Sequence, residues 1–217
     1  MTESDSGEYL REMADQGYDP DSIGSFHLTM IPWLAKKCGV GPKDLIIDVG
    51  SAQGHCVLSA YKAGYSNLAV VDVDPHNFEL FSNRYGIRCQ RADIEHDRLS
   101  FQDSEASLIM CVHLIEHLHE TGLFLSEARR VLGKSRAIAL VTPDWRKQYK
   151  TFWRDPTHVH PYDRESIARL LRMHGFRHVQ TYAWGSAYGL GRMGAYRLWP
   201  QLGLIGRDLL SIGFNPD

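Results

Sequence analysis

A chain of 217 residues that is 43% hydrophobic and 23% charged has the composition of an ordinary globular protein, long enough for one sizeable core. Its formal charge of −2 and pI near 6.6 provide no overall attraction to nucleic acid or anionic lipid, which argues against a nucleic-acid partner. No apolar run approaches the ~20 residues that a membrane span needs. The cysteines are widely spaced without a CxxC pair, and the acidic start has no secretory signal pattern, so we expect a cytoplasmic protein with reduced thiols.

The predicted elements begin with a helical cover. Residues 1–20 are polar and are expected to form a loose lead. Residues 22–39 carry apolar side chains at helical spacing and end in Gly39, which favours a helix. We therefore divide the chain into a helical cover over residues 1–40 and one main domain over residues 41–217.

Strands and helices alternate through the main domain. Strands are predicted over residues 44–50, 68–75, 87–93, 106–112 and 136–143. Helices are predicted over residues 55–64, 76–86, 121–133 and 163–175. Strands that are apolar throughout are typical of a parallel sheet covered by helices on both faces. The alternation therefore predicts a doubly wound, Rossmann-like α/β domain.

The end of the chain breaks this alternation. Residues 178–185 and 208–214 read as strands with no helix between them, so we expect an antiparallel hairpin that closes a seven-stranded, mostly parallel sheet. The glycine-rich segment 185–206 connects them. Four roles stay open for this segment: shaping a substrate pocket, contacting a membrane surface that carries a lipid-linked substrate, pairing subunits, or an ordinary loop that packs Trp199 on the core.

The turn after the first strand, in "LIIDVGSAQG", has the character of a cofactor loop. Gly50 and Gly54 allow a close approach of the backbone to a ligand, and Asp72 ends the next strand, where it could accept hydrogen bonds from ribose hydroxyls. A dinucleotide site would have GxGxxG, whereas this loop is GxxxG with Asp48 just before it. A carboxylate there repels pyrophosphate and suits a ligand that carries an ammonium or sulfonium charge.

Six segments extend this pattern in a fixed order along the chain: DVGSAQG, VVDVDP, RADIEHDRLSF, LIMCVHLIEHL, EARRVLG and IALVTP. In order and spacing they resemble class I S-adenosylmethionine-dependent methyltransferases, most of all the small enzymes that act on small molecules, lipids and glycans. The resemblance covers roughly residues 45–176. It implies a methyltransferase that uses S-adenosylmethionine.

The resemblance also implies roles for individual residues. Those expected around the methionine part of the cofactor are Asp48, Gly50, Ser51 and Gly54. Those expected around its ribose and adenine are Asp72, Val73, Asp93 and Ile94, and Cys111 and His113 would lie under the sulfonium. His117 would be structural.

Three positions depart from the family pattern. Ala52 replaces a frequent glycine of the loop, residues 106–107 are Ala-Ser instead of Phe-Asp, and "GKSR" replaces a Pro-Gly-Gly turn. None of these changes removes a residue expected to bind the cofactor. Ala52 and Ser107 nevertheless leave open a non-catalytic domain that binds a cofactor or a partner enzyme.

An acceptor site is expected after the fifth strand. Trp145, Trp153 and Arg154 belong to a stretch that interleaves aromatic with basic residues, which suits a sugar face with a phosphate or a stacked base. The alternative is a lid helix that buries its aromatics. The segment "RDPTHVHPYDRESIARLL" resembles one in methyltransferases associated with polysaccharide and O-antigen assembly.

His158 and His160 in this segment are the candidate general bases, since an imidazole is a fitting base for a hydroxyl acceptor. Asp155 could orient one of them, and His27 is a weaker candidate. Alternatively, His158 and His160 only stabilise the conformation of the loop. The histidines could also gather around a metal, His113 and His117 being four apart, but without a cysteine partner or a tight motif we expect no metal.

The function predicted from the sequence is methylation of a hydroxyl on a sugar, a glycan or a related polar metabolite. A natural-product methyltransferase differs only in its acceptor. An RNA methyltransferase would use the basic-aromatic stretch, against which the near-neutral charge argues.

Overall fold

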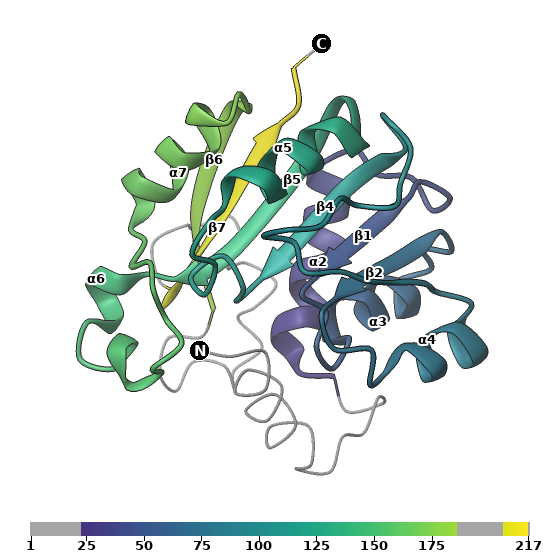
Figure 1. The fold of residues 1–217 in the computed structure, drawn as a ribbon, viewed down its shortest axis with the longest axis horizontal. Coiled ribbons are helices and arrows are strands. Elements are labelled where there is room, and N and C mark those ends of the chain that lie inside the picture. The colour runs from purple at the N-terminus through teal and green to yellow at the C-terminus, as the bar shows by residue number, and fades with distance from the viewer. Residues whose placement is uncertain (1–22, 186–205, 217) are drawn as a thin grey trace.

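The computed structural model describes residues 23–185 and 206–216, which build one seven-stranded sheet in the order β3-β2-β1-β4-β5-β7-β6 (Figure 1). Its strands are β1 (Ile46–Val49), β2 (Leu68–Asp72), β3 (Arg88–Arg91), β4 (Ala106–Val112), β5 (Leu132–Pro143), β6 (Arg177–Trp184) and β7 (Asp208–Phe214). The first five strands pair in parallel, and β7 runs antiparallel to both β5 and β6. The predicted doubly wound sheet with its closing hairpin is confirmed, and β7 lies between β5 and β6.

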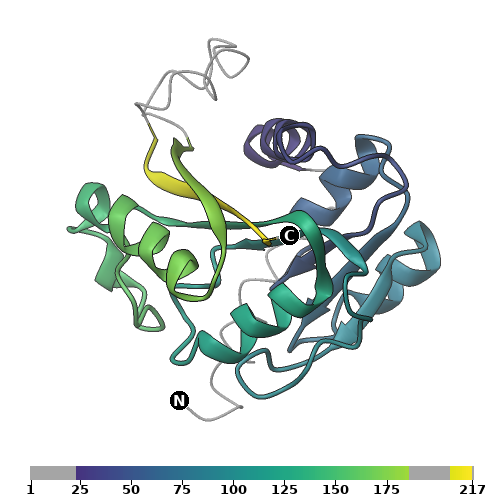
Figure 2. The same cartoon turned by 90° about the horizontal axis from the view of Figure 1, so that it is seen from above.

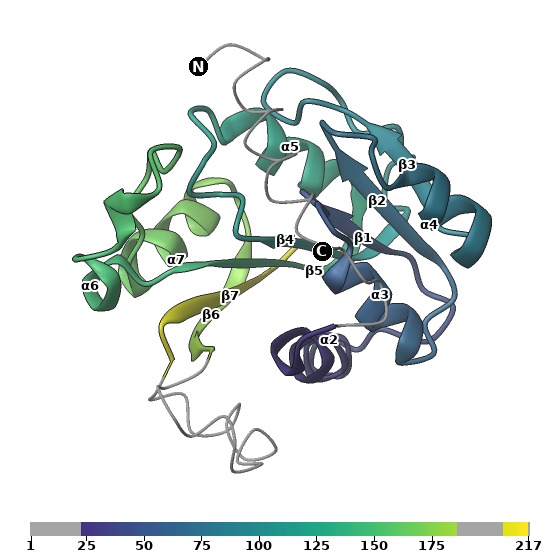
Figure 3. The same cartoon turned by 90° about the horizontal axis from the view of Figure 1, so that it is seen from below.

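Helices cover both faces of the sheet (Figure 2). They are α2 (Ser25–Lys37), α3 (His55–Lys62), α4 (Phe78–Tyr85), α5 (Gly122–Val131), α6 (Trp145–Gln148) and α7 (Arg164–Met173), with a 3-10 turn η1 (Phe152–Arg154). Figure 3 shows α2 and α3 on one face and α5 and α7 on the other. Each face has its own apolar core. Met30, Leu58 and Phe81 pack on the first, and Phe124 and Ile167 pack on the second.

The predicted helix over residues 22–39 is observed as α2, whose buried residues Met30, Ile31 and Leu34 join the core on the α3 face. Residues 1–22 of the predicted cover lie outside the described ranges, and its division from the main domain at residue 41 stays a prediction. None of the helices in the described ranges has the length and apolar character that crossing a bilayer requires.

The junction between α5 and β5 differs from the prediction. The helix predicted over residues 121–133 ends at Val131, because Leu132 already has extended angles (φ −72°, ψ 129°) and begins β5. The strand predicted from residue 136 therefore starts at residue 132. The alternative of a continuous lid helix after β5 is wrong, because the chain makes the four-residue α6 and the η1 turn there. Of the aromatic residues in this stretch, Phe152 is buried, as that alternative expected, whereas Trp145, Tyr149 and Trp153 are exposed.

Candidate active site

The carboxyl ends of β1, β2 and β4 meet at one edge of the sheet, because these strands are parallel neighbours. Asp208 reaches the same edge from the opposite direction, since it begins the antiparallel β7 and pairs with the last residue of β5, Pro143. In a doubly wound sheet this edge is where ligands bind. The candidate site therefore divides into a half after β1 and β2 and a half after β4 and β5.

The loop after β1 has a shape that requires glycine. Gly50 and Gly54 have φ of +71° and +75°, in the left-handed region that L side chains avoid. A Cβ on Gly54 would lie 2.4 Å from Cζ of Phe81, whose ring is fully buried. The loop thus passes tightly over α4 and then begins α3 at Gly54.

Two carboxylates below this loop are held by backbone N–H groups. Asp48, which is 2% exposed, accepts a 3.1 Å hydrogen bond from N–H of Val57 in α3. Burial, opposed by that hydrogen bond, raises the pKa of Asp48 to about 7. Asp72 accepts from N–H of Ala52 at 2.8 Å with one oxygen and from N–H of Asp74 at 3.0 Å with the other.

Asp48 and Asp72 suit a ligand that carries a positive charge and two neighbouring hydroxyl groups. A positive group near Asp48 would stabilise the ionised form that burial disfavours, and Asp72 lies at the edge with the 43% exposed Val73 beside it. Asp93 accepts from N–H of Glu95 and pairs with Nδ1 of His96, each at 3.0 Å. Ile94 is buried in the core on the α5 face. The expected contacts of Asp93 and Ile94 with an adenine stay predictions, as does the expected role of Ser51.

The half after β4 begins with a strained residue. His113 has φ of +53°, a conformation that is uncommon outside glycine and that concentrates at functional sites. Its Nδ1 lies 3.4 Å from Oε1 of Glu116, and its Nε2 lies 3.9 Å from Oδ2 of Asp208. Although burial acts in the opposite direction, these carboxylates raise the pKa of His113. Cys111, expected beside it under the sulfonium, is fully buried in the core, and this role stays a prediction.

Glu116 was missed by the sequence analysis and organises this half. Its side chain is fully buried, and Oε2 has no hydrogen-bond partner among the described residues. Its backbone carbonyl accepts from N–H of Val159 at 2.9 Å and from N–H of His160 at 3.0 Å. These two bonds fasten the predicted acceptor segment onto the turn after β4. A single Glu inside the apolar run "HLIEHL" was the available signal.

His117 and His158 lie together beside Glu116. Their ring centroids are 4.7 Å apart, and the three residues can present ligand atoms within 4.8 Å of one another. Nδ1 of His117 lies 2.8 Å from Oγ1 of Thr157, and Nδ1 of His158 lies 2.8 Å from the carbonyl oxygen of Phe152. The structure therefore brings together two of the histidines considered for a metal, with a carboxylate in place of a cysteine.

The other candidate bases lie in different surroundings. His160 binds the carbonyl oxygen of His119 through Nε2 at 3.3 Å. Asp155 accepts from Thr157, and its Oδ2 lies 4.0 Å from Nε2 of His158. The geometry thus associates Asp155 with His158, and the catalytic roles of His158, His160 and Asp155 stay predictions.

The helical cover adds imidazoles to the same edge. His27 of α2 lies 5.2 Å from the ring of His55, which begins α3 next to the glycine loop. Burial, with His55 and His113 nearby, lowers the pKa of His27 to about 4. His27 is therefore neutral at pH 7. His55 was not expected at the site.

The predicted acceptor residues lie on the segment that leads to these histidines. Trp145 is 36% and Trp153 is 57% exposed, and Arg154 is exposed as well. Phe152 is buried and lies between Trp153 and His158, with its ring centroid 5.0 Å from that of Trp153 and 4.4 Å from that of His158. One exposed aromatic ring, that of Trp153, is thus connected through Phe152 to the histidine group.

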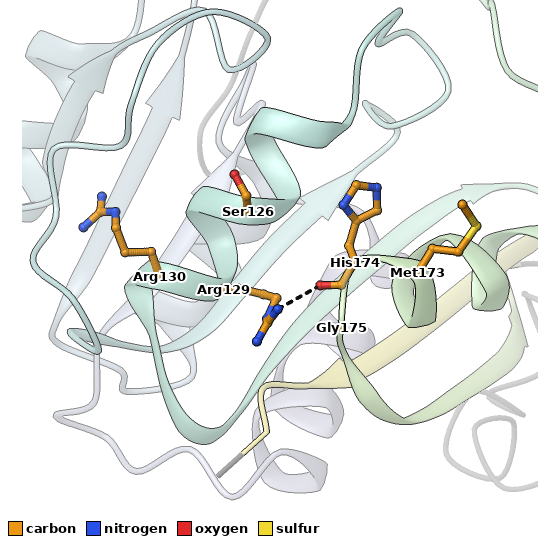
Figure 4. A pocket seen from close by; sticks show the side chains of 6 residues that line it. All are labelled: Ser126, Arg129, Arg130, Met173, His174 and Gly175. Carbon is orange, nitrogen blue, oxygen red and sulfur yellow. Dashed lines mark hydrogen bonds between the residues drawn. The ribbon is translucent and has the colours of Figure 1, made fainter.

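A hollow elsewhere on the molecule lies apart from this edge. It is open to solvent and lined by Ser126, Arg129, Arg130, Met173, His174 and Gly175 (Figure 4). These residues lie along the second half of α5 and at the end of α7, near the points where the chain enters β5 and β6, and so near the amino ends of those strands. Arg130 forms ion pairs with Glu127 and Asp103. The hollow is a packing feature of the opposite edge.

Comparison with known proteins agrees with this architecture. Residues 34–181 match the family model described as a methyltransferase domain, which is more than half of the chain. The chain therefore belongs to the methyltransferase domain family and is an enzyme of that class. A search of curated proteins gives no match.

Several solved structures share the fold. A SAM-dependent methyltransferase from Archaeoglobus fulgidus is 18% identical, with a TM-score of 0.66 and coverage of 95% of this chain and 99% of its own. One from Aquifex aeolicus is 16% identical, with a TM-score of 0.61 and coverage of 92% and 100%. The 1,6-didemethyltoxoflavin-N1-methyltransferase of Burkholderia thailandensis, with 1,6-didemethyltoxoflavin and S-adenosylhomocysteine bound, is 14% identical, with a TM-score of 0.68 and coverage of 99% and 87%. At these identities the likeness describes the fold.

Proposed function

We propose that the protein methylates a hydroxyl group on a sugar, a glycan or a related polar metabolite, with S-adenosylmethionine as the methyl donor. The observation that carries the choice of acceptor is the run of rings from the exposed Trp153 through Phe152 to His158. An exposed indole suits the apolar face of a sugar, and Arg154 beside it suits a phosphate or carboxylate on the same acceptor. A role in polysaccharide assembly follows from this acceptor.

The cofactor half would hold the methyl donor through residues of fixed position. Asp72 would accept from the ribose hydroxyls, and Asp48 would face the charged methionine end. S-adenosylmethionine supplies a methyl group already activated on sulfur. The chain therefore has to align the acceptor oxygen with the carbon–sulfur bond, exclude water and receive one proton.

The proton would leave toward the histidine group after β4. The oxygen forms the new bond to carbon while the electrons of the carbon–sulfur bond stay on sulfur, which becomes a neutral thioether. Nδ1 of His158 faces a backbone carbonyl, which can only accept, so the lone pair of a neutral His158 lies on Nε2. By the same reasoning the lone pair of a neutral His160 lies on Nδ1, since its Nε2 faces the carbonyl oxygen of His119. His158 is the preferred base because its ring contacts Phe152, which in turn contacts the exposed Trp153.

The test supplies labelled S-adenosylmethionine and separated glycan, lipid, small-molecule, protein and RNA fractions of a host extract. We expect label in the glycan or sugar fraction. The double variant His158→Ala and His160→Ala should lose turnover at least 100-fold, as expected when a general base is removed. Its affinity for S-adenosylhomocysteine, measured by calorimetry, should stay within about twofold, because the cofactor half is intact.

Label in another fraction would replace the proposed acceptor. Label confined to small molecules would favour a metabolite methyltransferase, and label in RNA with a steep salt dependence would reverse the inference from charge. Full turnover in the double variant would remove the histidines from the mechanism.

A further inference from the structure

We propose that Glu116, His117 and His158 form a binding site for one divalent first-row transition metal ion. The observation is their convergence: three potential ligand atoms, from two imidazoles and one carboxylate, lie within 4.8 Å of one another. Glu116 and His117 come from the turn after β4, whereas His158 comes from the segment after η1. An ion here would join two parts of the chain that are far apart in sequence.

The buried carboxylate is the first argument for a cation. Glu116 has no exposed surface, Oε1 has only a long contact to His113, and Oε2 has no hydrogen-bond partner among the described residues. An ionised carboxylate removed from water without a partner is unfavourable by several kcal/mol. A divalent ion against Oε2 would compensate for this desolvation.

The hydrogen bonds of the two imidazoles are the second argument. Thr157 donates its hydroxyl proton to Oδ1 of Asp155 at 2.6 Å, so its oxygen accepts from Nδ1–H of His117 at 2.8 Å. The carbonyl oxygen of Phe152 can only accept, so His158 also carries its proton on Nδ1. Both rings are thereby fixed in the tautomer whose lone pair is on Nε2. Metal-binding histidines are held in this way by their second nitrogen.

The donor set indicates which ions fit. Two imidazoles and a carboxylate suit zinc, iron, cobalt, nickel or manganese better than magnesium or calcium, which prefer sets made of oxygen. In a tetrahedral site, ligands bound at about 2.1 Å lie about 3.4 Å apart. Side chains whose ligand atoms lie within 4.8 Å of one another would therefore rotate inward to complete the set. Three protein ligands leave coordination positions for water or an acceptor.

The role of the ion rests on the proposed function. An acceptor hydroxyl bound at an open position would have its pKa lowered by the ion, as a metal-bound water does. With the ion bound, the Nε2 lone pair of His158 is used for the ion, so His158 is a ligand and takes the place of the direct base described under the proposed function. The ion lowers the pKa of the hydroxyl, whose proton then passes to solvent.

Binding is tested without any activity measurement. The full chain, purified with a tag that lacks histidine and treated with a chelator, is titrated with Zn²⁺ by calorimetry and with Co²⁺ by visible absorption. We expect one equivalent of each to bind, with Co²⁺ bands in the range of nitrogen and oxygen ligation. Mg²⁺ in large excess should not displace Zn²⁺.

Variants assign the site. His158→Ala should weaken Zn²⁺ binding at least 100-fold. Thr157→Val, which removes only the partner of Nδ1 of His117, should weaken it about tenfold, in the range known for such outer partners. His160→Ala is the matched control from the same segment and should bind as the wild type does. Circular dichroism and S-adenosylhomocysteine affinity show that each variant is folded.

The inference is overturned if the wild type binds no stoichiometric ion, or if His160→Ala weakens binding as much as His158→Ala. The results that would contradict the proposed function are different from these. Stoichiometric binding with the expected variant pattern, but no labelled glycan, would support the metal site and contradict the proposed glycan acceptor. Unchanged glycan methylation by a chain that binds no ion would support the proposed acceptor and contradict the metal site.

Discussion

The two halves of the candidate site are built by different means. In the half after β1 and β2, Asp48 and Asp72 are held by backbone N–H groups of α3, the glycine loop and the turn after β2. In the half after β4 and β5, side chains also hold one another, as in the series from His117 through Thr157 to Asp155, in addition to backbone bonds such as those to the carbonyl of Glu116.

This difference corresponds to what each half would recognise under the proposed function, the cofactor in the half after β1 and β2 and the acceptor in the half after β4 and β5. Backbone N–H groups are present whatever the side chain is, so they give a loop whose shape depends on a few glycines. Side-chain networks can be exchanged residue by residue, so they suit the part of an enzyme that selects its acceptor. The cofactor half should therefore respond most to changes in backbone conformation, and the acceptor half most to changes in side chains.

The largest effect is expected for Gly54→Ala. The new Cβ would lie 2.4 Å from the ring of Phe81, and φ would have to stay at +75°. Overpacking and left-handed strain together should lower the free energy of unfolding by about 4 kcal/mol. Thermal and urea unfolding measure the change, and cofactor affinity should fall as well.

Gly64→Ala is the matched control for this change. Gly64 has φ of +91° but no atom within 4 Å of the added Cβ, so only the strain applies, about 1–2 kcal/mol. Equal destabilisation by the two variants would show that the contact with Phe81 does not fix the loop.

In the half after β4 and β5, substitutions of two neighbouring aromatic residues should have different effects, one on stability and the other on activity. Phe152→Ala removes a buried ring that contacts His158 and should lower the free energy of unfolding by about 3 kcal/mol. Trp153→Ala removes a ring that is 57% exposed and should leave stability within about 0.5 kcal/mol. The same variant should raise KM for a sugar acceptor about tenfold, because a stacking face is lost. An unchanged KM would argue against Trp153 as an acceptor contact.

The sequence was sufficient for most of the fold. Strands that are apolar throughout, such as β2 with every residue buried, are typical of the interior of a parallel sheet, and the glycines after α3, α4 and α7 marked the helix ends correctly. The position of β7 between β5 and β6 could not be predicted, since strand order depends on long-range packing. Gly133 was wrongly predicted to end a helix, because a glycine is equally compatible with the start of β5.

The candidate site could be predicted only in part, for a similar reason. Asp48 lies within β1 and Asp72 ends β2, so their positions follow from the sheet. The grouping of Glu116 with His158 depends on how the segment after η1 folds back on the turn after β4, through bonds from Val159 and His160 to the carbonyl of Glu116. No local pattern specifies that contact.

The smallest expected effect concerns the position where the loop departs from its family. Ala52 has φ of +44°, so glycine there would remove left-handed strain while N–H of residue 52 still donates to Asp72. After allowance for the greater freedom of the unfolded chain, Ala52→Gly should raise the free energy of unfolding by about 1 kcal/mol. Ala63→Gly is the control, since Ala63 has φ of −82° at the end of α3, and it should lower stability by about 0.5–1 kcal/mol. Opposite signs in urea unfolding would show that backbone conformation governs the cofactor half, whereas destabilisation by both changes would mean that the alanine side chain supports the loop.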